Sequence, residues 1–174
     1  MIIEVIGIDP GARYTGVSVQ NLLDDEILLS STYVKPADTP LFTWAIQLGD
    51  MIATDIVALF PDASIGIEGI SAPKGYSNGK KSPINPKYVI FAGIVAGALA
   101  QRFSDAVIVP PGHNGNSRTG YPDVLMGRRP KTLPGSALGA GTRDHERSAY
   151  DVARAVPLLV ANNYKLDGKI EPLD

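Results

Sequence analysis

The sequence predicts an α/β fold built on a mixed five-stranded sheet with helices on both faces. Three strand-like segments come first, and helical segments then alternate with two short apolar strands, in the order β-β-β-α-β-α-β-α. Short turns can join the first three strands as antiparallel neighbours, whereas the later strands need helical crossovers, which makes the sheet mixed. A length of 174 residues suits one domain, so we expect a single domain over residues 1–174.

Five segments have the β-branched or alternating pattern of strands, at 2–9, 16–20, 26–34, 63–70 and 106–109. The first stops at the turn formers Pro10 and Gly11, so we expect the second to pair back with it as a hairpin. The first and fourth each carry a single acid in an otherwise apolar run, Asp9 and Glu68.

Three segments have helical periodicity. The first starts with Thr39 as its cap and Pro40 as its first helical residue, and its apolar residues form one stripe of Leu41, Ala45, Leu48, Ile52, Ile56 and Leu59. The second runs to about residue 103, and its Gly93 and Gly97 leave a flat face for close packing on the sheet or on another subunit. The third runs from about residue 143 through 156, and we expect Pro157 to kink it.

Composition excludes several kinds of site. The chain has no cysteine and two histidines, which excludes a disulfide scaffold, a thiolate nucleophile, a cysteine-bound zinc and a histidine-rich metal site. No charged-then-apolar leader opens the sequence, and its longest apolar stretch, 88–100, is shorter than the ~20 residues that span a bilayer. We therefore expect a soluble, cytoplasmic protein with no membrane partner.

Positive charge is concentrated in two loops rich in glycine and proline, although the whole chain has a net charge of −2. The loops at about 71–87 and about 112–143 each have a net charge of +4. Basic loops on an acidic body are typical of a protein that binds a phosphate backbone, although loops also collect lysine and arginine for solubility. The candidate DNA contacts are Lys74, Tyr76, Lys80, Lys81, Arg118, Arg128, Arg129 and Lys131, among which Tyr76 can stack on a base.

Asp9 and Glu68 are the first candidate metal ligands. Each lies near the carboxyl end of an apolar strand, where a carboxylate is costly unless it binds a metal ion or hydrogen-bond donors. If the two strands are neighbours, the carboxylates meet, and a divalent cation such as Mg²⁺ or Mn²⁺ relieves their repulsion. The alternatives are a turn-capping aspartate and an edge-strand glutamate that faces solvent.

The last helix offers a third acid. Asp144, Ser148 and Asp151 share one face by their i, i+4, i+7 spacing, with His145 on the adjoining stripe. Asp144 and Asp151 are ~10 Å apart along the axis, too far to bind one ion together. We expect Asp151, among apolar neighbours, to face the sheet and Asp144 to cap the helix or serve as an outer-shell ligand. His145 either orients a water or a phosphate, or is a surface histidine.

These residues resemble the three acidic motifs of the RuvC family, Holliday junction resolvases of the RNase H-like superfamily. The matching segments are Ile8-Asp9-Pro10-Gly11 with Thr15-Gly16, then Ile67-Glu68, then Ser148-Ala149-Tyr150-Asp151-Val152-Ala153. The family's last helix typically carries two acids three residues apart, and Ser148 stands where the first of them is expected. Asp144 or His145 is the candidate substitute, and an alternative register puts the pair on His145 and Ser148. The late motif is similar to that of bacteriophage and actinobacterial resolvases.

The resemblance implies a metal-dependent endonuclease that hydrolyses branched DNA, above all the four-way Holliday junction. Asp9, Glu68 and Asp151 would be the catalytic acids that hold two Mg²⁺ or Mn²⁺ ions. Asp144, His145 and Ser148 would be auxiliary. Because a junction is cut symmetrically, a homodimer with two sites is the simplest assembly. The expected location is the cytoplasm of a bacterial or phage-infected cell.

Three other interpretations stay open. Actin/hexokinase-like ATPases also place an Asp-x-Gly and a Thr-Gly after their first strand, but they need a second domain for which 174 residues leave no room. A catalytically silent RNase H-like nucleic-acid-binding module would explain Ser148 as a lost ligand. A relaxed nuclease would cut flaps, forks or other branched DNA.

Overall fold

The structure is a computed structural model that describes residues 4–70, 76–77, 80–81, 86–111, 121–126 and 143–161. Its five-stranded sheet has the order β3-β2-β1-β4-β7. The strands are β1 (Glu4–Asp9), β2 (Tyr14–Asn21), β3 (Glu26–Val34), β4 (Ser64–Glu68) and β7 (Val107–Val109). The first three are antiparallel neighbours, whereas β4 runs parallel to both β1 and β7.

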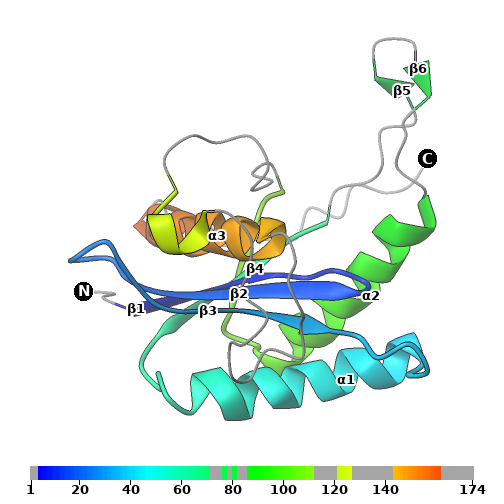
Figure 1. The fold of residues 1–174 in the computed structure, drawn as a ribbon, viewed down its shortest axis with the longest axis horizontal. Helices are drawn as coiled ribbons and strands as arrows, with labels where there is room; N and C mark the ends of the chain where they lie inside the picture. The colour runs from blue at the N-terminus through cyan, green and yellow to red at the C-terminus, as the bar shows by residue number, and fades with distance from the viewer. Residues whose placement is uncertain are drawn as a thin grey trace.

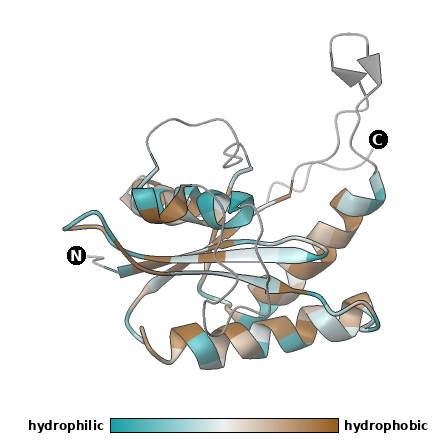
Figure 2. Ribbon diagram, viewed as in Figure 1, coloured by the Kyte–Doolittle hydropathy of each residue, from teal (hydrophilic) through white to brown (hydrophobic). Residues whose placement is uncertain are grey.

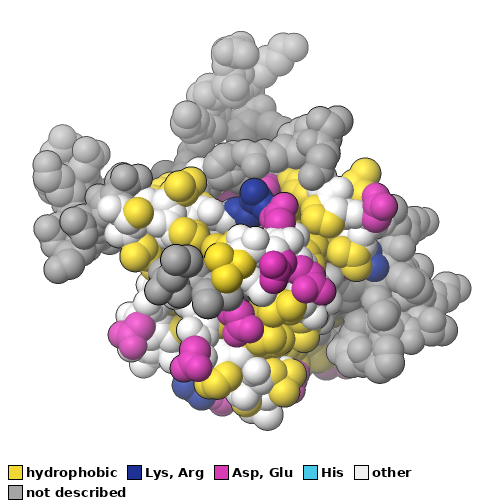
Figure 3. Space-filling view, turned by 90° about the vertical axis from the view of Figure 1, so that its left-hand side faces the viewer, with side chains coloured by type: hydrophobic (Ala, Val, Ile, Leu, Met, Phe, Trp, Pro, Cys, Tyr) yellow, Lys and Arg dark blue, Asp and Glu magenta, His cyan; other side chains and the backbone are white. Residues whose placement is uncertain are grey.

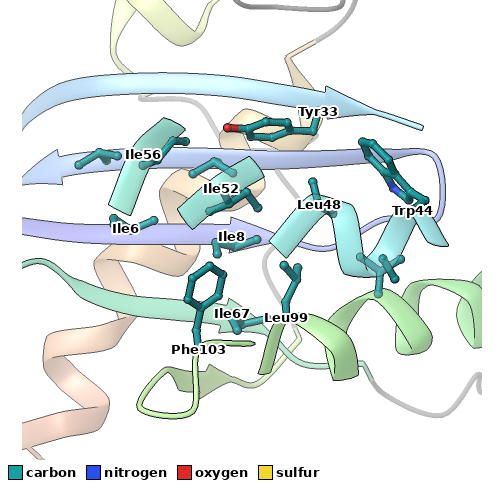
Figure 4. Packing of buried hydrophobic residues seen from close by; sticks show 14 residues of the cluster. Ile6, Ile8, Tyr33, Trp44, Leu48, Ile52, Ile56, Ile67, Leu99 and Phe103 are labelled. Atoms are coloured by element: carbon teal, nitrogen blue, oxygen red, sulfur yellow. The ribbon is translucent and has the colours of Figure 1, made fainter. Parts of the chain in front are cut away.

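Helices cover both faces of this sheet (Figure 1). α1 (Leu41–Ile52) and α2 (Pro86–Arg102) lie on one face, and α3 (Asp144–Ala161) lies on the other. The larger apolar core lies between the sheet and the first two helices (Figure 4), and its fully buried members include Ile6, Ile8, Val17, Leu48, Ile52, Ile67 and Leu99. The predicted mixed sheet with helices on both faces is therefore confirmed.

The first helix differs from the prediction at both ends. Pro40 is its N-cap residue, so the helix begins at Leu41. At its other end a π-helical turn, Ala53–Val57, continues the chain. This wider turn shifts the residues that follow it away from the apolar stripe. Leu59 is consequently 65% exposed, and its predicted place on the buried stripe is wrong.

Two other segments extend the predicted order. α3 continues past Pro157 to Ala161, so the proline lies inside the helix. Within the first basic loop, β5 (Tyr76–Ser77) and β6 (Lys80–Lys81) pair as a separate antiparallel sheet that the sequence did not predict. In the part of the chain that the structure describes, no helix is both long and apolar enough to cross a membrane.

Two glycines set the height of α3 above the sheet. Gly7 of β1 and Gly16 of β2 lie directly under its backbone. A Cβ atom at Gly7 would overlap the carbonyl oxygen of Ala149, and a Cβ atom at Gly16 would overlap that of His145. Glycine inside a strand often marks such a close approach of another backbone segment. Any larger residue at either position would push the first half of α3 away from the strand ends that carry Asp9 and Glu68.

We predict that Gly7→Ala destabilises the fold by about 1–3 kcal/mol, the usual cost of overpacking a well-packed interior. Urea unfolding measures the change. Gly93→Ala in α2 is the matched control, because a Cβ atom there meets no atom within 4 Å. Alanine is also the better helix former, so this control should equal or exceed the wild type in stability. Equal stability of Gly7→Ala and the wild type would contradict the close approach.

Candidate functional site

The sheet register brings Asp9 and Glu68 together. They are the last residues of β1 and β4, and the preceding residues, Ile8 and Ile67, are direct partners in the parallel pairing of the two strands. Ile8 and Ile67 are buried in the core under α1 and α2. Because side chains alternate along a strand, Asp9 and Glu68 project from the opposite face, toward α3. The carboxylates of Asp9 and Glu68 therefore lie close together, as the sequence predicted for two neighbouring strand ends.

The first turns of α3 bring polar side chains to both carboxylates. The His145 Nδ1 atom lies 2.8 Å from Asp9 Oδ2. The Ser148 hydroxyl donates a hydrogen bond of 3.3 Å to Glu68 Oε2. Residues three apart on a helix share a face, so one side of α3 supplies the side chains that contact both acids. Gly16 permits these contacts because the His145 carbonyl rests directly on it.

Glu68 occupies an environment that favours its protonated form. Burial, the charge of Asp9 and a hydrogen bond with Asp9 raise its pKa from 4.5 to about 8. The hydrogen bond from Ser148 acts in the opposite direction, and the charge of Asp151 adds to the rise. Three acids of the candidate site are thus close enough to interact electrostatically.

His145 is drawn to the acids by charge. Burial of the imidazole disfavours its cationic form, but the hydrogen bond and charge of Asp9, together with the charge of Asp144, raise the pKa of His145 above its ordinary value. Its side chain remains 39% exposed. The structure therefore combines the two alternatives for this residue: it is partly at the surface, and it also contacts a site acid.

Asp151 is held by a residue that the sequence analysis missed. It is 5% exposed, and its Oδ2 atom accepts a hydrogen bond of 2.6 Å from the hydroxyl of Tyr121. Tyr121 belongs to the second basic loop, whose composition gave no periodic signal. The grouping of Tyr121 with Val124 and Leu125 in an otherwise polar segment is the one hint that this part of the loop packs on the protein.

Asp144 lies beside the acids but is not joined to them by a hydrogen bond. Its carboxylate pairs with Arg147 Nη1 at 3.1 Å. An outer-shell role for Asp144 therefore stays a prediction. In the first turn of α3, His145 is the residue that contacts Asp9.

A buried ion pair fixes the start of α3 on the sheet. Glu146 is fully buried, and it accepts hydrogen bonds from Arg143 at 2.9 Å, Thr32 at 3.0 Å and Ser30 at 3.2 Å. The sequence analysis missed this network as well. Its signal is the pair of polar residues at alternate positions of β3, which places two hydroxyls on the face that α3 covers.

The donor set suits a hard divalent cation. Carboxylate oxygens are the ligands that Mg²⁺ and Mn²⁺ prefer, and such an ion would relieve the repulsion that raises the pKa of Glu68 beside Asp9 and Asp151. Among the described residues, however, no three histidine, aspartate or glutamate side chains are grouped closely enough to hold one ion as they stand. At least one of the three acids Asp9, Glu68 and Asp151 would have to turn for all three to share an ion.

Both basic loops begin at the edge of the sheet that carries the acids. The first follows the carboxyl end of β4, and the second follows that of β7, which is parallel to β4. Tyr76, Lys80 and Lys81 lie in β5 and β6, for which the structure describes the backbone alone. The remaining candidate contacts lie outside the described residues: Lys74, Arg118, Arg128, Arg129 and Lys131.

Comparison with known proteins identifies the fold. No family model matches the sequence, and a search of the curated proteins finds no match. The solved structure of T. thermophilus RuvC in complex with a Holliday junction substrate matches with a TM-score of 0.57 and 14% identity, over 92% of this chain and 96% of that one. A second structure of Thermus thermophilus RuvC matches with a TM-score of 0.56 and 13% identity over the same shares. The chain therefore has a RuvC-like, RNase H-like fold.

The raised pKa of Glu68 predicts a specific pH dependence of stability without metal ions. The folded state favours the protonated Glu68 carboxyl. The contribution of this group to the free energy of unfolding is therefore fully present below pH 4.5 and is lost as the pH rises through about 8. Glu68→Gln keeps the shape but cannot ionise. In EDTA, the free energy of unfolding of the wild type should therefore fall relative to this variant between about pH 5 and pH 8. Parallel pH profiles of the two proteins would contradict the shift.

Proposed function

We propose that this chain is a metal-dependent endonuclease that cleaves branched DNA and resolves four-way junctions. The observation that carries the proposal is the group of acids at the ends of two adjacent parallel strands, with Asp151 on the helix that covers them. The fold likeness supports it, since one matching structure is RuvC bound to a Holliday junction substrate. The late motif of α3 favours the phage and actinobacterial branch of such resolvases.

Each site residue has a distinct task in this proposal. Asp9, Glu68 and Asp151 hold two Mg²⁺ or Mn²⁺ ions, which when bound activate a water and neutralise the charge that develops on the phosphate and the leaving oxygen. Ser148 donates to Glu68 and so favours its ionised, metal-binding form. His145 orients Asp9 through its Nδ1 atom. Because a metal-activated water would be the nucleophile, the proposal needs no side-chain nucleophile.

The DNA approaches from the edge of the sheet that carries the acids. Both basic loops leave the sheet there, and their lysines and arginines bind the phosphate backbone without reading sequence. The opposite edge, where β1 begins, has a different surface: the described side chains visible there are mainly apolar and acidic (Figure 3). The difference in charge between the two edges favours DNA binding at the edge from which the basic loops leave.

The face of α2 that carries Gly93 and Gly97 is the interface of the proposed homodimer. Gly93 and Gly97 do not pack on the sheet, because a Cβ atom at either position meets nothing within 4 Å. They line a groove of about 240 Å³ between α2 and the sheet, whose other wall includes Glu68, Gly69 and Ile108. Apolar and neutral residues predominate along this helix (Figure 2), and Ile90, on the same stripe as the glycines, is 61% exposed. A second copy on this face would place two acid sites near one two-fold axis.

We expect Asp9→Asn to abolish cleavage of a synthetic four-way junction in Mg²⁺ while junction binding stays intact. The loss should exceed the 10–100-fold effect that is typical of residues that only support a metal ligand. Asp50→Asn is the control: this exposed acid lies on α1, on the face of the sheet opposite α3, and pairs with Arg102, so cleavage should stay near that of the wild type.

Two results would contradict the endonuclease proposal. Retained cleavage in Asp9→Asn would remove this residue from the site. Junction binding by a wild-type protein that never cleaves would instead identify a silent binding module, and ATP turnover would point to the ATPase interpretation.

We predict that Ile90→Asp converts the dimer to a monomer without unfolding the chain, because a carboxylate in an apolar interface loses its hydration. Ile46→Asp is the matched control, since Ile46 lies on α1 and is 67% exposed. Sedimentation velocity distinguishes the species. A wild-type monomer, or a dimer that survives Ile90→Asp, would show that α2 is not the interface.

A further inference from the structure

The contact between Tyr121 and Asp151 is short and shielded from water. The phenol hydroxyl donates to Asp151 Oδ2 at 2.6 Å, within the range of a charge-assisted O–H···O⁻ hydrogen bond. Tyr121 is 8% exposed and Asp151 is 5% exposed, so little water competes for the bond. Thirty residues of sequence separate the two partners. The bond therefore connects a candidate metal ligand with a distant part of the chain.

The segment that carries Tyr121 is anchored on α3 at several points. Leu125 is fully buried in a small apolar cluster with Tyr121 and Tyr150. The rings of the two tyrosines meet edge to face, with centroids 5.8 Å apart. The Arg147 Nε–H group donates to the Leu125 carbonyl at 2.9 Å. These contacts fix the direction from which the Tyr121 hydroxyl reaches the carboxylate.

We propose that Tyr121 is a positioning residue that orients the Asp151 carboxylate for binding of a divalent metal ion. The inference rests on the proposed function, because it assumes that Asp151 is a metal ligand. Carboxylates that bind metal ions are commonly held by hydrogen bonds from neighbouring groups, and loss of such a partner typically weakens metal affinity 10–100-fold. Here the hydroxyl holds Oδ2 and thereby limits rotation of the carboxylate.

The ring and the hydroxyl of Tyr121 have separable roles. The ring packs in the apolar cluster, a task that phenylalanine would perform equally well. The hydroxyl contacts a carboxylate and contributes nothing to apolar packing. Since Tyr121 lies between Arg118 and Arg128 in the sequence, the segment that carries the second group of basic residues also holds a site acid.

The test compares Mn²⁺ binding to full-length Tyr121→Phe and Tyr150→Phe by electron paramagnetic resonance without DNA. Tyr150→Phe is the matched control: it removes a hydroxyl from the same cluster, and that hydroxyl contacts Arg154 at 3.0 Å instead of a site acid. We expect Tyr121→Phe to weaken Mn²⁺ affinity about 10–100-fold and Tyr150→Phe to leave it unchanged. Thermal unfolding checks that both variants are folded.

A second readout separates positioning from general structure. In Tyr121→Phe, the Mg²⁺ concentration that gives half-maximal junction cleavage should rise by the same factor, and saturating Mg²⁺ should restore the wild-type rate. Wild-type Mn²⁺ affinity in Tyr121→Phe, or equal weakening in both variants, would overturn the assignment.

The Mn²⁺ binding data also distinguish an error in the proposed metal site from an error in the role of Tyr121. If the wild type binds no more Mn²⁺ than Asp9→Asn does, the proposed metal site itself is absent, and the role of Tyr121 is overturned with it. If the wild type binds Mn²⁺ at the site and Tyr121→Phe binds it equally well, the role of Tyr121 alone is wrong.

Discussion

The close approach of α3 to the sheet is the constraint on which the candidate site depends. Gly7 and Gly16 are the places where the helix backbone rests on the strands, and neither position has room for a methyl group. A helix held any higher would separate His145 from Asp9 and Ser148 from Glu68, contacts of 2.8 Å and 3.3 Å. The buried Glu146 network then fixes the first turn of the same helix on β3. The geometry of the acids is thus a consequence of backbone packing.

The same packing brings acids together in a partly buried place, which disfavours the ionised form of Glu68. Glu68 is partly buried between Asp9 and Asp151 with a pKa of about 8, which means that at neutral pH the apo protein favours a proton at this position. In the proposed function, a divalent cation displaces this proton and supplies the missing positive charge, so metal binding would be coupled to proton release. Glu146 shows the contrasting solution on the same helix, where the buried carboxylate has a permanent partner in Arg143, at 2.9 Å. Glu146 thus has a permanent cationic partner, whereas Glu68 would gain one only when the proposed metal ion binds.

The sequence predicts the sheet, the three helices and the positions of Asp9 and Glu68, because each of these depends on local periodicity or on an acid inside an apolar strand. It fails where a distant contact or a local irregularity decides. The π-helical turn at Ala53–Val57 shifts Leu59 into solvent, and no residue pattern announces that turn. Tyr121 finds Asp151 through tertiary packing alone. Gly93 and Gly97 could face either the sheet or another subunit, and the open groove beside them is visible only in the folded chain.

An anomalous-scattering map from crystals soaked in Mn²⁺ tests most directly whether the acids form a metal site. We expect density for manganese between the strand ends of β1 and β4, bordered by Asp9, Glu68 and Asp151. Manganese bound only elsewhere on the protein, with this position empty at saturating Mn²⁺ and pH above 8, would contradict it, since Glu68 is then ionised and free to bind.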